Sequence, residues 1–449
     1  MTPTVASIAL PAYVYAVHAG DVNADGRDEL VVELRTPAGN APDKVTLFIV
    51  SVGADGRVGG STSVELGNQP TLWDVNHGLW AIDKDGVRKF DVGTGTSARV
   101  ASVPTPLAGL GPSTPSRWEF ARDLDHDGTP ELLVPSQGRL LAFEPDGGGR
   151  GGIPFASEGA LGVEKVAGAS VLTTSARLPG LAICDVDGDG VDDIVLPAHK
   201  SAAVYFTAPN LGARAATIAL PIDLEPRELP PKPGEVKRTI ADIWFQDLNG
   251  DNKADIAIDR WVTNGGFFGA TAEILFAAGN GSGFGPVTTL TTSAAGFGVE
   301  PRDIDGDGDQ DFVLREVDVG MGNLARALVS KAVRVQLSAF VFAGSAYGAK
   351  TTPLRGMTFP LEPPDRLQNE LADVDGDGKL DVVTNDAEDR IRVYRGKTGG
   401  MEESASIDVP LKMPPGDDIL FTHDFTGDGH AEILVWGPGQ PTATLIRAQ

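Results

Sequence analysis

The chain is poor in the residues that build several common folds and sites. Its one cysteine in 449 residues, Cys184, excludes an internal disulfide framework, and no zinc signature is present. Aromatic residues make up 6%, and helical periodicity is scarce, being clearest at 323–332. No apolar run is long enough to span a membrane, and no basic leader segment opens the chain. These absences argue against a disulfide scaffold, a helical bundle and a membrane-spanning protein.

Basic residues are also few. Lys and Arg number 37 against 62 Asp and Glu, which gives a formal charge of −25. Without a basic patch to offset phosphate repulsion, a nucleic-acid partner is not expected. The 56 glycines and 32 prolines instead indicate many short strands and tight turns. The most linker-like piece, 223–235, lies between two copies of a repeat, so we expect residues 1–449 to form a single domain.

An acidic nine-residue pattern, D-x-[DNT]-x-D-[GN]-x-x-[DE], occurs seven times and is followed each time by a short apolar run. Carboxylate or amide oxygens at positions 1, 3, 5 and 9, with a backbone carbonyl at position 7, supply the oxygen-only shell that Ca²⁺ prefers. Glycine at position 6 allows the sharp turn. Four acids within nine residues would repel one another without a cation. We therefore expect up to seven calcium ions.

The expected calcium ligands of each loop occupy positions 1, 3, 5, 7 and 9, in that order. The first four loops hold Asp21, Asn23, Asp25, Arg27 and Glu29; Asp123, Asp125, Asp127, Thr129 and Glu131; Asp185, Asp187, Asp189, Val191 and Asp193; and Asp247, Asn249, Asp251, Lys253 and Asp255. The last three loops hold Asp303, Asp305, Asp307, Asp309 and Asp311; Asp373, Asp375, Asp377, Lys379 and Asp381; and Asp424, Thr426, Asp428, His430 and Glu432.

The seven loops are predicted to differ in calcium affinity. The loops that begin at Asp185, Asp303 and Asp373 have an aspartate at all four side-chain positions and are predicted to bind best. The Asp247 loop, with Asn252 in place of the turn glycine, and the Asp424 loop, with Thr426, are predicted to bind most weakly.

An EF-hand or dockerin loop would need an acid at position 12, where this chain has apolar residues or threonine. A glycosidase pair of carboxylates is disfavoured, because the acids lie two residues apart beside a turn glycine.

Strand, acidic loop and apolar strand in succession form the pattern of the FG-GAP or VCBS repeat, and the sequence resembles that family of β-propellers along nearly its whole length. The resemblance implies an all-β fold in which each repeat is one four-stranded blade, with the calcium loop joining its first and second strands. The spacing from Asp21 to Asp123 is nearly twice the others, so a blade without ligands is expected between them, at 72–103. Eight blades result, with seven blades and one irregular segment as the alternative.

Closure of the ring is expected at the termini. After Asp424 the sequence supplies only a second and a third strand, and 5–10 can provide the missing fourth strand. Residues 1–10 thus complete the last blade. The blades are expected to start near residues 13, 70, 117, 180, 240, 297, 367 and 418.

Function is expected on the face opposite the calcium loops. The longest insertions, 221–238, 260–270, 316–332 and 360–369, map to strand connections on that face, and Arg260, Trp261, Phe267 and Phe268 are the candidate ligand-binding residues. The alternative is that these aromatic side chains only fold back over the disc. The partner class is protein or glycan, and the acid-rich loops are suited to a calcium-replete, extracellular, cell-surface or periplasmic setting.

No catalytic motif supports an enzyme. The alternative of a calcium-dependent polysaccharide lyase would require a base beside an arginine, with Arg260 or Arg366 as candidates. A third possibility is an architectural subunit of a surface assembly. The sequence therefore favours a non-enzymatic binding platform with structural calcium.

Overall fold

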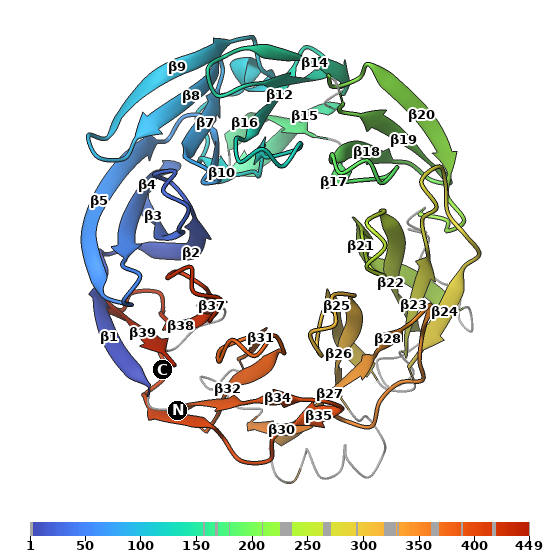
Figure 1. Cartoon of the computed structure of the whole chain (residues 1–449). Helices are drawn as coiled ribbons and strands as arrows, with labels where there is room; N and C mark the ends of the chain where they lie inside the picture. Colours follow the sequence, from blue (N-terminus) through green and yellow to red (C-terminus); the bar gives the residue numbers. More distant parts are fainter. Residues whose placement is uncertain are drawn as a thin grey trace.

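Each repeat of the sequence forms a blade of four antiparallel strands, and eight such blades are arranged in a ring, with a fifth strand added to the sheet of blade 2 (Figure 1). The computed structural model describes residues 3–155, 158–166, 169–178, 180–208, 210–224, 236–263, 271–292, 295–317, 329, 332–360, 368–387, 389–414 and 419–448. The predicted all-β propeller with eight blades is confirmed. The predicted helix-like stretch 323–332 lies mostly outside the described residues; within it Val329 is helical and 87% exposed.

The blades follow one another along the chain. The first four consist of β2 (Val14–Gly20), β3 (Glu29–Ala38), β4 (Ala41–Val52) and β5 (Val58–Gly67); β6 (Leu72–Asp74), β7 (Leu79–Asp83), β8 (Gly86–Asp91) and β9 (Thr96–Ser102); β11 (Ala121–Arg122), β12 (Glu131–Ser136), β13 (Arg139–Phe143) and β14 (Gly149–Pro154); and β17 (Ala182–Cys184), β18 (Asp193–Pro197), β19 (Ser201–Phe206) and β20 (Arg214–Ala219).

The last four blades consist of β21 (Lys237–Gln246), β22 (Asp255–Thr263), β23 (Thr271–Ala277) and β24 (Thr288–Thr291); β25 (Ala295–Arg302), β26 (Asp311–Val317), β27 (Ala332–Phe340) and β30 (Arg355–Pro360); β31 (Asn369–Ala372), β32 (Asp381–Ala387), β33 (Arg390–Tyr394) and β36 (Ile407–Pro410); and β37 (Leu420–His423), β38 (Glu432–Val435), β39 (Thr442–Arg447) and β1 (Thr4–Ala9).

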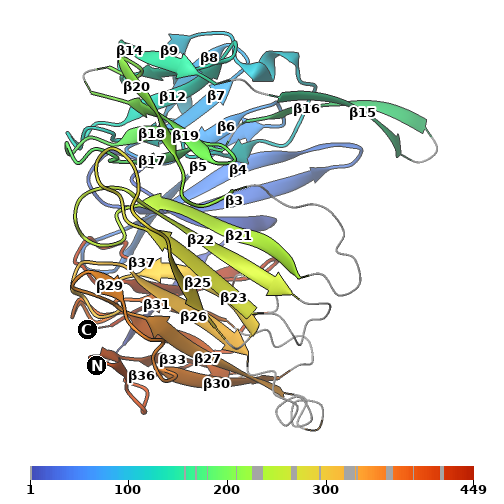
Figure 2. The ribbon, with the colours of Figure 1, turned by 90° about the vertical axis from the view of Figure 1, so that its right-hand side faces the viewer.

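Additional elements interrupt this plan. They are a 3₁₀ turn at Pro106–Gly109, the short strand β10 (Ser116–Arg117), and the hairpins β15–β16 (Glu158–Val166 and Ala169–Arg177), β28–β29 (Phe342–Ala343 and Ala346–Tyr347) and β34–β35 (Gly396–Lys397 and Gly400–Met401). The hairpin β15–β16 projects from the disc on the side away from the acidic loops (Figure 2). It is an insertion that the repeat pattern does not predict.

The second strand of each blade is the most deeply buried, because neighbouring blades cover both of its faces. All six residues of β12 and all four of β38 are buried. This explains why the apolar run after each acidic loop is continuous instead of alternating. The core is correspondingly built between blades: Leu47 of blade 1, for example, belongs to the same apolar cluster as Trp73 and Leu79 of blade 2.

The ring closes as expected. Strand β1 pairs antiparallel with β39, with Val5 opposite Ile446 and Ile8 opposite Ala443, so both ends of the chain lie in one blade (Figure 1). Pairing with β39 covers what would otherwise be the outer edge of three strands.

Blade 2 is the predicted blade without an acidic loop. Its strands β6 and β7 are joined by a short turn in which His77 has a φ of 47°. The carboxylate of Asp74, which is buried, accepts hydrogen bonds from the backbone N–H groups of Phe120 and Ala121 at 2.8 and 2.9 Å. An acid thus remains at the start of the turn, but its carboxylate binds the backbone where the chain enters blade 3.

Candidate metal centres and the opposite face

The seven acidic loops share one hydrogen-bonding pattern, which follows from the spacing of their acids. The position 1 aspartate accepts a bond from the N–H of position 6 at 2.8–3.0 Å in every loop. The position 5 aspartate accepts one from the N–H of position 7 at 2.8–3.3 Å. The position 9 acid accepts one from the N–H of position 2 at 2.8–3.2 Å. Each of these bonds fixes the orientation of a carboxylate within the loop.

Position 6 adopts a left-handed conformation in all seven loops. The φ values run from 81° to 97° at Gly26, Gly128, Gly190, Gly308, Gly378 and Gly429, and Asn252 follows with 61°. Glycine has no steric penalty in this conformation, and asparagine tolerates it better than most residues. The substitution of asparagine for glycine in the blade 5 loop therefore keeps the turn.

Position 4 is also left-handed, which the repeat pattern does not predict. It is glycine in five loops, but Ala24 has a φ of 60° and His126 a φ of 57°. Each of these glycines lies against the loop of the next blade: an added Cβ at Gly250 would be 3.7 Å from the Cβ of Asp309, and one at Gly188 would be 3.1 Å from the Cγ of Lys253. The loops of blades 4 to 8 and of blade 1 consequently form a belt of touching loops on one face.

Ala24→Gly is expected to raise the free energy of unfolding by about 0.5–1 kcal/mol, because it relieves a left-handed conformation at an exposed position. Chemical denaturation of the two proteins measures the change. The matched control is Ala9→Gly in β1, which removes a side chain from an exposed strand position and is expected to lower stability. A destabilised Ala24→Gly protein would contradict the assignment of strain.

Backbone hydrogen bonds join neighbouring loops. The N–H of position 8 donates to the carbonyl of position 1 or 2 in the preceding loop: Asp192 to Leu124 at 2.7 Å, Ala254 to Asp185 at 2.7 Å, Gln310 to Leu248 at 2.9 Å and Ala431 to Asp373 at 2.8 Å. The conformation of one loop thus constrains the next.

Four loops bring three carboxylate oxygens within 4.8 Å of one another. These groups are Asp123, Asp125 and Asp127; Asp185, Asp187 and Asp193; Asp303, Asp305 and Asp311; and Asp373, Asp375 and Asp381. They include the three loops that the sequence singles out as best. Such Asp-rich groups could each hold a metal ion.

The position 3 side chain tests whether a cation fits. Four loops have aspartate at this position. In three of them one oxygen, of Asp125, Asp187 or Asp305, is buried without a hydrogen-bond partner, and in the fourth the buried oxygen of Asp375 forms an ion pair with Arg395. Where position 3 is neutral, it donates to position 9 instead: Asn23 to Glu29 at 2.7 Å and Thr426 to Glu432 at 3.2 Å. A buried, unpaired carboxylate oxygen is costly unless a cation compensates it. The donor set therefore fits a hard divalent cation.

The pKa values of the position 9 acids also indicate that their ionised forms are not fully compensated by positive charge. Burial is the largest cause, and nearby aspartates add to it: together they raise the pKa of Glu29, Asp193 and Asp255 to about 7 and the pKa of Asp311 and Asp381 to about 6. The pKa values of Glu131 and Glu432 are also raised, chiefly by burial.

The metal-free protein is expected to lose stability as pH rises. An acid whose pKa is higher in the folded than in the unfolded state binds protons more tightly when folded, so its contribution is present below its unfolded pKa of about 4 and is lost as pH rises through about 6 to 7. Melting temperatures of the protein dialysed free of metal should thus fall across this window. A rise with pH would show that the acids are not destabilising when ionised.

Arginines from outside the acidic loops reach four of them, a feature with no signal in the nine-residue pattern. Arg150 of β14 lies 2.8 Å from Asp125 and also contacts Glu131, so it bridges positions 3 and 9. Arg447 of β39 contacts Asp428 and lies 3.4 Å from Glu432. Arg214 and Arg395 reach only the position 3 aspartates of blades 4 and 7. In blades 3 and 8 a guanidinium thus lies between ligand positions.

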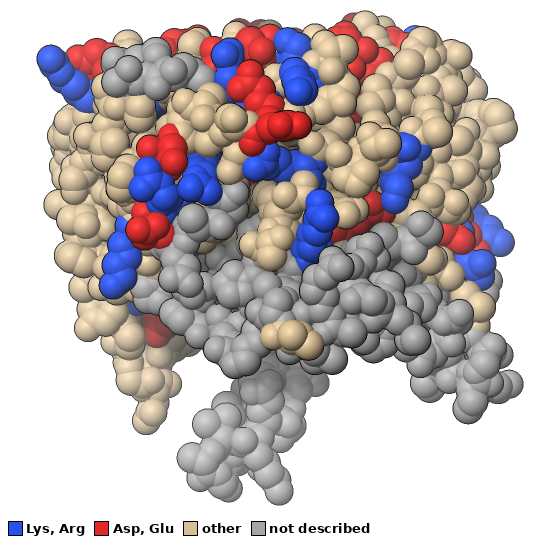
Figure 3. Space-filling view, turned by 90° about the horizontal axis from the view of Figure 1, so that it is seen from below, with Lys and Arg blue, Asp and Glu red and all other residues tan. Residues whose placement is uncertain are grey.

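The opposite face is only partly described. Arg260 and Trp261 lie on β22, where Arg260 Nε donates to Glu273 at 3.0 Å and Trp261 is half-buried. Phe267, Phe268 and Arg366 lie outside the described residues, as do large parts of the four predicted insertions. On the side of the ring in Figure 3, Lys and Arg are interspersed with Asp and Glu, without an extended field of one sign among the described residues.

The blades and their loops define the class of the protein, a β-propeller with acidic loops. Residues 373–435, from the loop of blade 7 to the second strand of blade 8, match a family described as FG-GAP-like repeat. This match over blades 7 and 8, together with the eight blades, confirms the predicted resemblance to FG-GAP/VCBS-repeat propellers. No curated protein matches the chain.

Several solved structures are similar at low identity. One is an Agrocybe aegerita lectin, whose structure is described as the basis of specific recognition of non-reducing terminal N-acetylglucosamine. It is 15% identical to this chain, with 99% of each chain covered and a TM-score of 0.42. The V. cholerae biofilm matrix protein Bap1 is 13% identical, with 96% of this chain and 76% of that chain covered and a TM-score of 0.25. TcdB2-TccC3 without its hypervariable C-terminal region is 15% identical, with 93% and 17% covered and a TM-score of 0.27. No described helix is both long and apolar enough to cross a membrane.

Proposed function

We propose that this protein is a non-enzymatic extracellular binding platform, in which calcium stabilises one face of the propeller and the opposite face recognises a protein or a glycan. The observation that carries the proposal is the buried position 3 oxygen without a hydrogen-bond partner in three of the acidic loops, which a bound cation would compensate. Calcium in all seven loops would offset much of the negative charge and pin the turn between the two inner strands of each blade. Ligand recognition is then expected on surfaces outside the calcium sites.

The opposite face has features that suit recognition. The hairpin β15–β16 extends from it, and the half-buried Trp261 lies near the end of β22, on the strand that leads into one of the predicted insertions. Projecting hairpins and loops on a rigid scaffold are common sites of binding. The pairing of Arg260 with Glu273 argues for a structural or positioning role of this arginine, and it weakens the lyase alternative, which requires an arginine available to the substrate carboxylate.

A glycan array with calcium-loaded protein, combined with an assay for unsaturated uronates on alginate and polygalacturonate, tests the proposal. Binding without release of unsaturated product supports it. Product formation would establish the lyase instead. Cross-linking on native cells, with failure of all soluble ligands, would favour an architectural subunit of a surface assembly.

The two arginine-bridged loops lead to a prediction about calcium. Arg150→Gln is expected to tighten calcium binding at blade 3 by about tenfold, since it removes a positive charge that competes for Asp125 and Glu131. Titration calorimetry measures the affinity and the number of ions. The matched control is Arg139→Gln in the same blade, because Arg139 donates to the carbonyl of Gly152 and not to a loop acid. Unchanged or weaker calcium binding by Arg150→Gln would show that the arginine supports the site.

A further inference from the structure

The described part of the ring departs most from the blade plan between blades 2 and 4. Strand β10 pairs in parallel with β6, placing Ser116 opposite Leu72 and Arg117 opposite Trp73, so that blade 2 gains a fifth, innermost strand. Blade 3 is left with an inner strand, β11, of only two residues. The same chain segment cannot serve both blades, and the inner wall of blade 3 is therefore incomplete.

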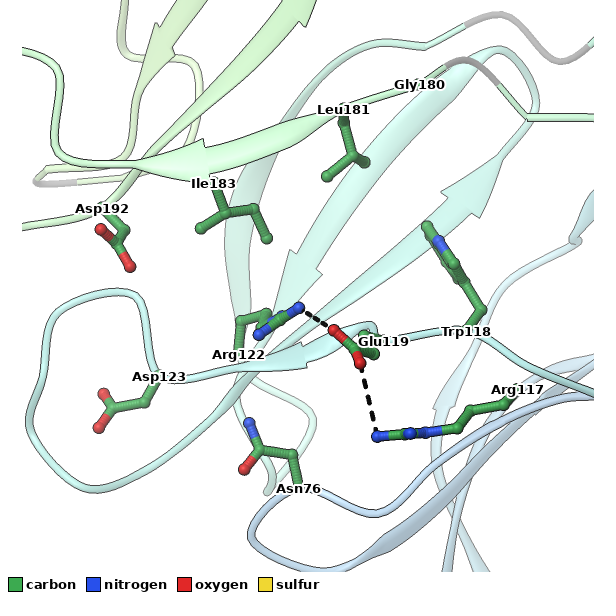
Figure 4. A pocket seen from close by; sticks show the side chains of 10 residues that line it. All are labelled: Asn76, Arg117, Trp118, Glu119, Arg122, Asp123, Gly180, Leu181, Ile183 and Asp192. Atoms are coloured by element: carbon green, nitrogen blue, oxygen red, sulfur yellow. Dashed lines mark hydrogen bonds and ion pairs between the residues drawn. The ribbon is translucent and has the colours of Figure 1, made fainter. Parts of the chain in front are cut away.

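A cavity of about 750 Å³ lies at this gap (Figure 4), within the usual size of small-molecule sites. We call it the inner pocket. It is lined by Asn76, Arg117, Trp118, Glu119, Arg122, Asp123, Gly180, Leu181, Ile183 and Asp192. One side is apolar, formed by Trp118, Leu181 and Ile183, and the other presents planar polar groups.

The polar side chains are held in place. Glu119 forms ion pairs with Arg122 and, at 3.5 Å, with Arg117, whose other terminal nitrogen lies 3.2 Å from Nδ1 of His18. Asn76 donates through Nδ2 to the carbonyl of Ala121 at 2.8 Å, which leaves its carbonyl oxygen as an acceptor. Arg122 Nε is buried without a hydrogen-bond partner. The pocket thus offers oriented donors and acceptors beside an aromatic surface.

Charge decides which ligands suit these groups. The two guanidiniums share the carboxylate of Glu119, and Asp192 adds further negative charge, whereas the charge of Asp123 would be offset by calcium in its loop. An anionic ligand would have to displace Glu119 and approach the carboxylate of Asp192. A neutral, polyhydroxylated ligand can instead bond to both donors and acceptors and can pack its apolar face on an aromatic ring.

We propose that the inner pocket binds a neutral saccharide, with Trp118 as the stacking surface and Asn76, Glu119 and Arg122 as hydrogen-bonding groups. This inference rests on glycan recognition by the proposed platform. It differs from the proposed function in the place of the site, because the pocket lies beside the central channel, next to Asp123 and Asp192 of two acidic loops, and not at the insertions of blades 4–6 on the opposite face. Trp118 is half-buried and Glu119 is exposed, so both are accessible from the pocket.

The test uses the full chain loaded with calcium and saturation-transfer NMR with glucose, galactose, mannose and their N-acetylamino forms, with glucuronate and inorganic phosphate as anionic comparators. Trp118→Leu keeps apolar bulk but removes the ring face, and it is expected to weaken binding of a neutral sugar by about tenfold or more. Glu119→Ala frees two guanidiniums and is expected to shift the preference toward glucuronate and phosphate. Trp244→Leu, at a half-buried tryptophan of β21 that does not line the pocket, is the matched control and should leave binding unchanged. Trp261→Leu reports on the opposite face, and melting temperatures verify that each variant is folded.

The outcomes separate the inference from the proposed function. Loss of sugar binding in Trp261→Leu but not in Trp118→Leu would overturn the inner pocket and leave a glycan-binding platform in place. Binding of only the anionic compounds, or of none of the sugars, would also overturn it, and the platform would then rest on protein recognition alone. A change of preference in Glu119→Ala would support the pocket even if Trp118→Leu failed to fold.

Discussion

Removal of calcium is expected to lower the melting temperature of this protein by about 10 °C or more. At about 10 mM calcium and dissociation constants of about 0.1–1 mM, each ion contributes about 1.4–2.7 kcal/mol of folding free energy. Seven sites then add about 10 kcal/mol or more. With an unfolding entropy of about 2.1 cal/mol/K per residue, the melting temperature of a chain of 449 residues shifts by about 1 °C for each kcal/mol of folding free energy.

Calorimetric scans with calcium and with excess EGTA measure this shift, and scans with magnesium serve as the control, because Mg²⁺ loses its water reluctantly. The effect is expected to be larger than the sum of isolated loops, since the belt of hydrogen bonds between loops transmits the order of one loop to the next. An identical melting temperature in EGTA would refute structural calcium. It would leave the buried oxygens of Asp125, Asp187 and Asp305 without an explanation.

Loss of the closing strand is expected to be the second large effect. Ile8 is 2% exposed and packs in the cluster that also holds Leu434 and Leu445. Ile8→Ala should lower the free energy of unfolding by about 2–5 kcal/mol. Val5, in the same strand, is 55% exposed, so Val5→Ala should change stability by less than about 0.5 kcal/mol. Chemical denaturation compares the two substitutions directly.

Deletion of residues 1–10 extends this test. Without β1, the edge of β39 and part of the apolar cluster of the last blade are exposed, and exposed strand edges promote association between chains. Size-exclusion chromatography should show higher oligomers, and the thermal transition should broaden. A monomeric, cooperatively melting deletion variant would mean that the ring is held without its closing strand.

The loops and the ring could be predicted from the sequence because they depend on residues that are close in the chain or that recur at regular spacing. Nine residues contain both partners of nearly every hydrogen bond that shapes a loop, as in the bond from Gly378 to Asp373. The spacing of the loops exposed the blade without ligands, and the number of strands after Asp424 required the N-terminal strand for closure. The ligand assignments themselves stay predictions, as does the binding role of Arg260, Trp261, Phe267 and Phe268.

Other features depend on residues far apart in the chain. The parallel pairing of β10 with β6 forms the inner pocket, and it joins Ser116 to Leu72, residues that share no repeat signature. The bridge from Arg150 to Asp125 and the contact of Gly250 with the loop of blade 6 arise only when strands and blades pack. The sequence by itself determined the repeating loop and favoured eight blades closed by the N-terminal strand, because these follow from local backbone bonding and apolar periodicity. Tertiary structure alone decided which loops meet an arginine, how the loops interlock and where a pocket opens, because these depend on packing between blades.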